Sequence, residues 1–166
     1  MKYLKHLRYR LIHKWYVFLE MCKIGRPLLG LIHDISSFCP SEFLAYSEYF
    51  YGKSAGNRSK KVYNSTHNSG DKFDRAVFLH FARNKHHWQY WIMPLEIDIE
   101  EDEEYDKCIA LEIPEKYVEE MICDWKGAAK AKKNKNTIQQ WYIEYCYKFN
   151  LHYITRKLIE QKLGIN

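Results

Sequence analysis

The feature of the sequence that most constrains the fold is a His-Asp pair at the end of an apolar segment. Residues 27–32 are almost all apolar, and His33 and Asp34 follow them directly. An apolar helix of this kind packs in a core, where an ionised carboxylate is costly unless it is paired or binds a cation. Neighbouring residues on a helix point in different directions, so the pair can bind one cation only at a helix end or with help from other helices. The sequence therefore predicts a domain in which other helices converge on His33 and Asp34.

Helical periodicity and capping signals divide the chain into six or seven helices. In the first, over 2–24, the apolar residues that recur at helical spacing form one side, namely Leu4, Leu7, Leu11, Trp15, Phe18 and Met21. Gly25 is a stop signal, and Pro40-Ser41-Glu42 is a start signal. Further helices are expected over 27–37, 41–51, 72–92, 115–131, 138–149 and 153–163, with a short strand or extended segment over 107–113. The predicted fold class is all-α, a single helical bundle over 1–166.

Composition excludes several classes of protein and marks two loops. Apolar residues make up 46% of the chain, which excludes disorder. Five cysteines, an odd number without a C-x-x-C pair, argue against a disulfide framework and a zinc finger. Residues 52–71, rich in Gly, Ser, Asn and Lys, are expected to form a flexible loop, and the acidic residues 96–106 a surface loop.

The partners and location of the protein follow from charge and hydropathy. A net charge of +5 is weaker than a dedicated DNA-binding footprint, so nucleic acid is an alternative partner rather than the favoured one. The chain has no apolar run of the about 18 residues that span a membrane. Its basic N-terminus leads into no signal-peptide pattern. We therefore expect a cytoplasmic protein with no membrane partner.

Two further polar residues lie in apolar helical settings. His13 lies midway along the first predicted helix, and Asp124 lies within the mostly apolar Met121–Trp125. A helical bundle can bring such positions together with His33 and Asp34 on its axis, where metal sites are commonly built. Imidazole and carboxylate ligands suit a divalent ion such as Mn, Fe, Co, Ni, Zn or Mg. The sequence thus predicts a metal site formed by these four residues.

A second cluster of polar residues lies between positions 80 and 88. His86 and His87 are candidate ligands of a second ion, which would give one or two metals per chain. The candidates for binding a phosphorylated substrate are His80, Arg83, Asn84, Lys85 and Trp88. Arg83 suits this role because a guanidinium contacts phosphate oxygens in pairs. The alternative is a half-buried helix with hydrogen-bonded histidines.

Three other features are candidates for a role in chemistry. Glu42 is a candidate general base beside Asp34, and the alternative is a carboxylate that caps a helix start. Lys126 and Lys130, with Lys132, are candidates to bind a substrate anion, although such lysines are often only solvated surface. The aromatic residues that could stack a nucleobase, if they do not simply fill the core, are Trp88, Tyr90, Trp91, Trp125 and Trp141.

The order of a His, a His-Asp pair and a distant Asp resembles the HD superfamily of metal-dependent phosphohydrolases. His13, His33, Asp34 and Asp124 match that pattern. A closer resemblance, over nearly the whole chain, is to a family of bacterial and phage proteins catalogued as domain of unknown function 5662. The strings that carry it are Gly30–Asp34, Ser36–Phe43, Arg83–Trp91 and Met121–Ala128.

The resemblance implies a bundle of the HD type in the cytoplasm of a bacterium or of a phage-infected bacterium. It implies a phosphohydrolase in which a metal-activated water attacks a nucleotide or cyclic nucleotide, with a His-His pair such as His86 and His87 at a second ion. Both families often carry a lysine where this chain has Ser37. Two alternatives stay open, a di-iron oxygenase on the same scaffold and a metal-stabilised module that binds a nucleotide without turnover.

Overall fold

The computed structural model describes residues 1–53, 72–94 and 108–165, and it is built from helices. The helices are α1 (Lys2–Lys23), α2 (Pro27–Ile32), α3 (Pro40–Tyr51), α4 (Lys72–Arg83), α5 (Glu115–Ala131), α6 (Ile138–Tyr145) and α7 (Tyr153–Leu163). Three 3-10 turns join them, η1 (Ile35–Phe38), η3 (Trp88–Trp91) and η4 (Cys146–Lys148). These elements confirm the all-α class. Nearly all of the predicted loop 52–71 and the whole of 96–106 lie outside the described residues.

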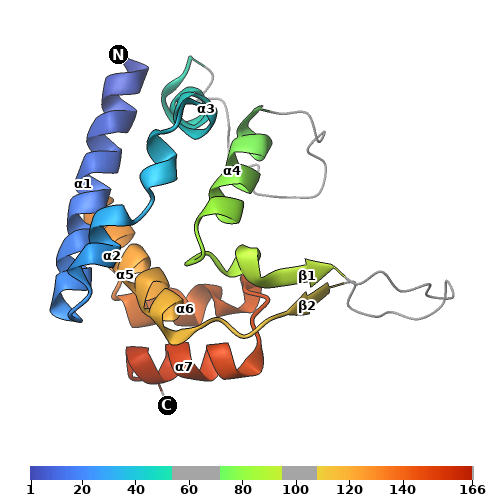
Figure 1. The fold of residues 1–166 in the computed structure, drawn as a ribbon. Coiled ribbons are helices and arrows are strands. Elements are labelled where there is room, and N and C mark those ends of the chain that lie inside the picture. Colours follow the sequence, from blue (N-terminus) through green and yellow to red (C-terminus); the bar gives the residue numbers. More distant parts are fainter. Residues whose placement is uncertain (54–71, 95–107, 166) are drawn as a thin grey trace, which may run out of the picture.

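Helix α5 runs through the middle of the molecule (Figure 1). It packs against α1 on one side and against α6 and α7 on the other, while α1 also contacts α2 and α3, and α4 packs on α3. The main apolar core lies between α5, α6 and α7 and includes Met121, Ile122, Tyr142 and Ile159. None of the described helices combines the length and the apolar character that crossing a membrane requires.

The close approach of α1 to α5 depends on Gly127. A Cβ atom at this position would lie 2.5 Å from Val17 Cγ2 and 3.0 Å from the Val17 backbone nitrogen. Val17, Met21 and Cys123 fill the small core on this side of α5. The glycine therefore brings the two backbones together, and with them the residues one turn away, His13 and Asp124.

A two-stranded ribbon holds the segment that follows α4. Strand β1 (Ile92–Pro94) pairs antiparallel with β2 (Cys108–Ala110), with Met93 opposite Ile109. One further backbone bond, from Leu111 N to Trp91 O at 2.8 Å, continues the pairing into η3. The strand predicted within 107–113 is therefore present at Cys108–Ala110, and it anchors the turn that carries His86 and His87.

Three predicted helices end early, each for a local reason. The helix predicted over 27–37 ends at Ile32, because Asp34 adopts a left-handed conformation with φ 51° and ψ 30°. Aspartate is among the few residues that tolerate this conformation. The helix predicted over 72–92 ends at Arg83, and Asn84 turns back to donate its side-chain amide to the His80 carbonyl. The helix predicted over 138–149 gives way to η4 at Cys146.

The apolar side expected to pack inward on the first helix is largely exposed. Leu4, Leu11 and Trp15 are 71%, 54% and 57% exposed. The buried residues of α1 are His6, His13, Val17, Glu20 and Met21. Most of the buried residues are offset from the expected side by about two positions, or roughly 200° around a helix, and Met21 belongs to both sets. Helix α1 is turned so that its polar residues meet partners on α3 and α5, and this contact overrides the apolar pattern.

Candidate metal centre

The four residues predicted to bind one metal do converge between α1, α2 and α5. His13 Nε2 lies 3.0 Å from Asp124 Oδ1, and His33 Nε2 lies 3.5 Å from the same oxygen. His33 Nε2 also lies 3.7 Å from Asp34 Oδ2. The His13, His33 and Asp34 side chains are almost fully buried. Contributions from three separate helical regions thus meet at one point inside the bundle.

A second group of histidines faces the other oxygen of Asp34. His80 Nε2 lies 3.5 Å and His86 Nε2 lies 3.3 Å from Asp34 Oδ1. His87 has a ring nitrogen within 4.8 Å of ligand atoms of both Asp34 and His80. Asp34 therefore stands between the two groups, with one oxygen toward each. His80, expected to bind substrate, lies instead among the candidate ligands.

Three of these histidines have their Nδ1 atom, the ring nitrogen that points away from Asp34 and Asp124, in contact with a buried carboxylate. Glu120 Oε1 lies 3.0 Å from His33 Nδ1 and 3.3 Å from His86 Nδ1. Glu42 Oε2 lies 2.9 Å from His80 Nδ1. Metal-binding histidines almost always hold their second ring nitrogen in this way, which fixes the ring with the first nitrogen aimed at the ion. Among the described residues, this orientation is the observation that makes the group a candidate metal centre.

Glu120 is the residue of this arrangement that the sequence reasoning did not find. It lies four positions before Asp124 on α5, so the two share a helix face one turn apart. The signal was available, since Glu120 precedes the apolar run Met121–Cys123 and falls on the same face as a predicted ligand. Its side chain is 5% exposed, which is rare for a glutamate without partners.

Glu42, the candidate general base, is enclosed by donors. Its side chain is 1% exposed, and it accepts hydrogen bonds from Arg83 Nη1 at 2.7 Å and from Ser36 Oγ at 3.1 Å. Asn84 completes the group by donating to Ser36 Oγ at 2.8 Å. In this position Glu42 orients His80. Arg83 and Asn84, expected to bind substrate, support Glu42 and Ser36.

Several buried atoms of the centre make no hydrogen bond among the described residues, and three of them have only ion-pair contacts of 3.3 to 3.7 Å. The atoms that make no hydrogen bond are His33 Nε2, Asp34 Oδ1, His86 Nε2 and His87 Nε2. A buried polar atom left without a partner costs about 1–3 kcal/mol, so a native structure that holds several of them calls for an explanation such as a bound ion. The set of imidazole nitrogens and carboxylate oxygens suits a first-row divalent metal. The residues present therefore fit the group.

The charges of the centre are set by mutual contact. Burial alone would raise the pKa of Asp34 and Asp124, but the surrounding histidines hold both well below the ordinary value, so the carboxylates are ionised. Burial alone would lower the pKa of His33, but the adjoining carboxylates raise it to about 10. For His87, burial and the neighbouring histidines hold the pKa well below its usual range. A cation bound here would compete with the proton of His33.

Arg10 contacts Ser37, the position at which the resemblance led us to expect a lysine. Ser37 is buried and donates its hydroxyl to the Asp34 carbonyl at 2.6 Å. Arg10 Nε donates to Ser37 Oγ at 3.1 Å, and Arg10 Nη2 donates to Asp34 Oδ2 at 2.8 Å. Arg10 lies one turn before His13 on α1, so the same helix supplies a ligand and a cation.

Other predicted substrate residues lie outside the centre. Lys130 pairs with Glu20, and Lys85 lies over the rings of Tyr90 and Tyr117 at 5.7 and 6.0 Å. Burial raises the pKa of the Cys123 thiol to about 12, and the positive charge of nearby Lys126 offsets part of this rise. Among the predicted lysines, the structure places Lys132 in the lining of the cavities beside the centre.

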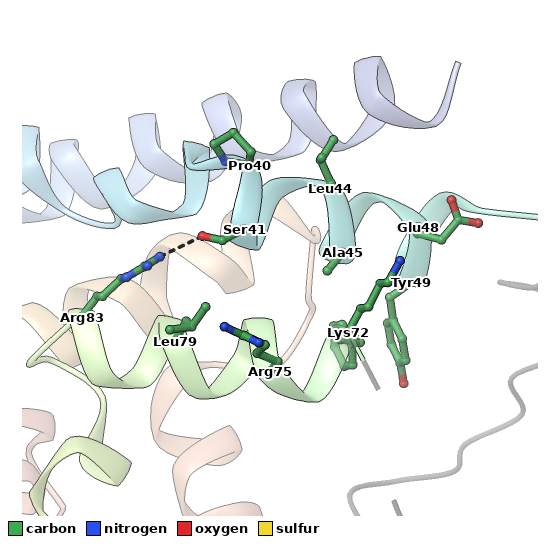
Figure 2. Close-up of a pocket in the computed structure, with 11 residues that line it drawn as sticks. Pro40, Ser41, Leu44, Ala45, Glu48, Tyr49, Lys72, Arg75, Leu79 and Arg83 are labelled. Atoms are coloured by element: carbon green, nitrogen blue, oxygen red, sulfur yellow. Dashed lines mark hydrogen bonds between the residues drawn. The ribbon is translucent and has the colours of Figure 1, made fainter. Parts of the chain in front are cut away.

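Two cavities flank the centre, and a third lies behind it. A cavity of about 320 Å³ is lined in part by His87 and Asp124, and one of about 430 Å³ is lined in part by Tyr9 and Arg10. Figure 2 shows the third, of about 750 Å³ between α3 and α4, with Arg83 bonded to Ser41 at its edge. Arg83 also holds Glu42, so it links the lining of this cavity to the centre.

Comparison with known proteins gives a family but no reaction. The model of a family of unknown function, DUF5662, matches residues 2–165. No curated protein and no solved structure matches the chain.

Proposed function

Because the chain belongs to the family DUF5662, whose description names no reaction, we propose from the site itself that the protein is a metal-dependent phosphohydrolase. One observation carries the proposal: His33, His80 and His86 each hold Nδ1 on a buried carboxylate and aim Nε2 at Asp34 or Asp124. The expected substrate is a nucleotide or cyclic nucleotide.

In this proposal the candidate ligands form two sets that share Asp34. His13, His33, Asp34 and Asp124 would hold one ion, and the oxygen of Asp34 on the opposite side would hold a second with His80, His86 and His87. Divalent ions in such sites lower the pKa of bound water toward neutrality and offset charge on a phosphoryl oxygen. The residues of the chain provide the fixed geometry, because Glu42 and Glu120 prevent three of the rings from turning.

Arg10 is placed to bind the substrate phosphate. Its guanidinium lies beside Asp34 and at the edge of a cavity, and it carries more donors than the two that Asp34 and Ser37 engage. A guanidinium fixed in this way stabilises charge that develops on phosphate oxygens. Arg10 would thus do from α1 what a lysine at position 37 is expected to do in related proteins.

The large share of imidazole supports a second candidate. Five histidines surround Asp34 and Asp124, and imidazole is a common ligand of iron. A di-iron oxygenase would use the same residues with oxygen in place of water. A metal-stabilised nucleotide-binding module would also use them, without turnover.

The test compares the purified protein with Asp34→Asn. Asparagine tolerates the left-handed backbone at this position, so the change removes a ligand charge without adding strain. Metal content is measured by plasma mass spectrometry, and phosphate release is measured on a panel of nucleotides. The control is Glu48→Gln, which removes an exposed ion pair with Lys2. Metal and phosphate release that are both lost only in Asp34→Asn would support the hydrolase.

The other outcomes separate the alternatives. Bound iron with oxygen consumption and no phosphate release would favour the oxygenase. Bound metal with tight nucleotide binding and no product would favour the binding module. Wild-type protein that takes up no divalent metal would overturn the proposal.

A further inference from the structure

The cavity of about 320 Å³ beside the centre has the lining of a site for a planar ring. It lies between α5, the start of α6 and the turn η3, and its aromatic residues are Trp88, Trp125, Trp141 and Phe149. Their rings pack on one another, with Trp125 stacked on Phe149 at 5.5 Å, so the walls are braced before any ligand arrives. Aromatic side chains that are fixed in this way stack nucleobases without choosing strongly among them.

Two residues of the lining each carry a buried polar atom that has no hydrogen-bond partner within the described part of the chain. His87 Nε2 and Gln89 Oε1 are both covered and accept no hydrogen bond there. Asp124 of the metal centre lines the same cavity. One end of the cavity therefore opens on the candidate ligands, and Gln89, whose amide oxygen is buried and accepts no hydrogen bond from the described residues, lies in its wall.

The cavity is shaped by small residues on α5. Ala128 lies one turn after Asp124 on the same face, and Ala129 follows it, so the space beside the ligand is left open. Its volume is at the lower end of the range for small-molecule sites, which runs from about 300 to 1,000 Å³. A single nucleoside matches this volume, whereas a dinucleotide or a polymer would extend out of it.

We propose that this cavity binds the base of a mononucleotide, with the phosphate at the metal centre, between the end formed by His87 and Asp124 and the guanidinium of Arg10 beside Asp34. Gln89 Oε1 would accept a hydrogen bond from a ring N–H or amino group of the base. The inference rests on the proposed function for the position of the phosphate, and it adds where the base binds and which residues recognise it.

The cavity on the other side of the centre serves as the comparison. It is lined by Tyr9, Arg10 and Ala131, and it shares Lys132 with the proposed site. Its lining includes none of the candidate ligands and no buried atom without a partner. A base bound there would use α1, whereas a base bound in the proposed site would use α5 and α6.

Two matched substitutions on α5 distinguish the cavities. Ala128→Leu fills the proposed site, and Ala131→Leu makes the same change in the other cavity three residues away. Binding is followed by quenching of tryptophan fluorescence, since three tryptophans line the proposed site, with nucleoside 5′-monophosphates and with ribose 5-phosphate as the probe that lacks a base. Circular dichroism and metal content check that each variant keeps its fold and its centre.

We expect Ala128→Leu to weaken mononucleotide binding roughly tenfold or more, because stacking on the walls is lost. Ala131→Leu should leave it unchanged, and wild type should bind ribose 5-phosphate much more weakly than a mononucleotide. Loss of binding in Ala131→Leu alone, or ribose 5-phosphate bound as tightly as the mononucleotide, would overturn the inference.

A second variant covers the case in which Ala128→Leu does not fold. Gln89→Leu removes the amide acceptor and should change the order of preference among the bases, whereas an unchanged order would overturn the role of Gln89. Because these assays measure binding and not turnover, base-dependent binding without phosphate release would reject the hydrolase and retain the cavity.

Discussion

His33 and His86 share one carboxylate oxygen, with their Nδ1 atoms 3.0 and 3.3 Å from Glu120 Oε1. His33 follows α2, and His86 lies in the turn after α4, so a single side chain of α5 joins distant parts of the chain. Each ring then has its other nitrogen aimed at Asp34 or Asp124. The orientation of both rings depends on one glutamate.

Glu120→Gln should weaken metal binding about tenfold or more, because outer carboxylates of this kind typically contribute 10–100-fold. The amide keeps the shape but removes the charge that holds two imidazoles. Titration calorimetry with Mn²⁺ and Zn²⁺ measures the change. Glu119→Gln, which alters a partly exposed pair with Arg26 and Lys162, is the control on the same helix. Equal affinities for the two variants would contradict the role given to Glu120.

Glu42→Gln separates an orienting carboxylate from a general base. The structure has Glu42 on His80 Nδ1, so we expect the variant to lose the second ion and to keep the first. Plasma mass spectrometry should give a lower metal content per chain, and phosphate release should recover in part at high metal concentration. A general base would behave differently, with full metal content and phosphate release abolished at every metal concentration.

Gly127→Ala should lower the free energy of unfolding by about 1–3 kcal/mol, the usual cost of overpacking. The new Cβ would meet Val17 Cγ2 at 2.5 Å, and the Val17 backbone prevents α1 from yielding easily. Urea unfolding measures the loss. The double variant with Val17→Ala should recover part of it, since the nearest atom is gone. A double variant whose losses simply add would show that the helices do not meet here.

His6 should make the protein sensitive to mild acid. Burial, aided by Arg10, lowers its pKa to about 4, and the ring stacks on Phe43. A histidine with a depressed pKa stabilises the fold fully above its unfolded pKa of about 6.5, and this stability is lost as the pH falls toward 4. Between pH 7 and 5 the loss is about 2 kcal/mol.

The comparison for this prediction is His6→Gln. At pH 7 the variant should have a lower free energy of unfolding than wild type, because the stacking on Phe43 is lost. Between pH 7 and 5 it should lose less stability than wild type does. Urea unfolding at both pH values, with a chelator present, gives the two differences. Equal losses in the two proteins would mean that folding does not lower the pKa of His6.

The sequence predicted the helices and the convergence of four polar residues better than it predicted the surroundings of those residues. His13, His33, Asp34 and Asp124 could be found because each is a polar residue in an apolar setting. The contact of Arg10 with Asp34 and Ser37 could not be predicted, because it depends on the rotation of α1 about its axis. That rotation is decided by contacts between helices, and the apolar pattern of Leu4, Leu11 and Trp15 points the other way.

The turns that end two of the helices were also not predicted from the sequence. Asp34 follows the end of α2 with a left-handed backbone, and Asn84 ends α4 by donating its side-chain amide to the His80 carbonyl. Neither residue is as strong a stop signal in a sequence as Gly or Pro. His86 and His87 were predicted on a helix but lie in the turn after it. They reach Asp34 because the ribbon of β1 and β2 fixes that turn, which is a long-range effect.

Asp34 joins segments that the chain itself keeps far apart, and this has a consequence for how the molecule opens. An ion held between α1, the end of α2, the end of α4 and α5 would act as a cross-link that closes several long loops at once. Helices α6 and α7 supply no residue to it. Backbone amides of the first five helices should then exchange with deuterium more slowly when metal is present, while those of α7 keep their own rate. Metal would then slow the opening of the part of the molecule that it cross-links more than the opening of the C-terminal helices.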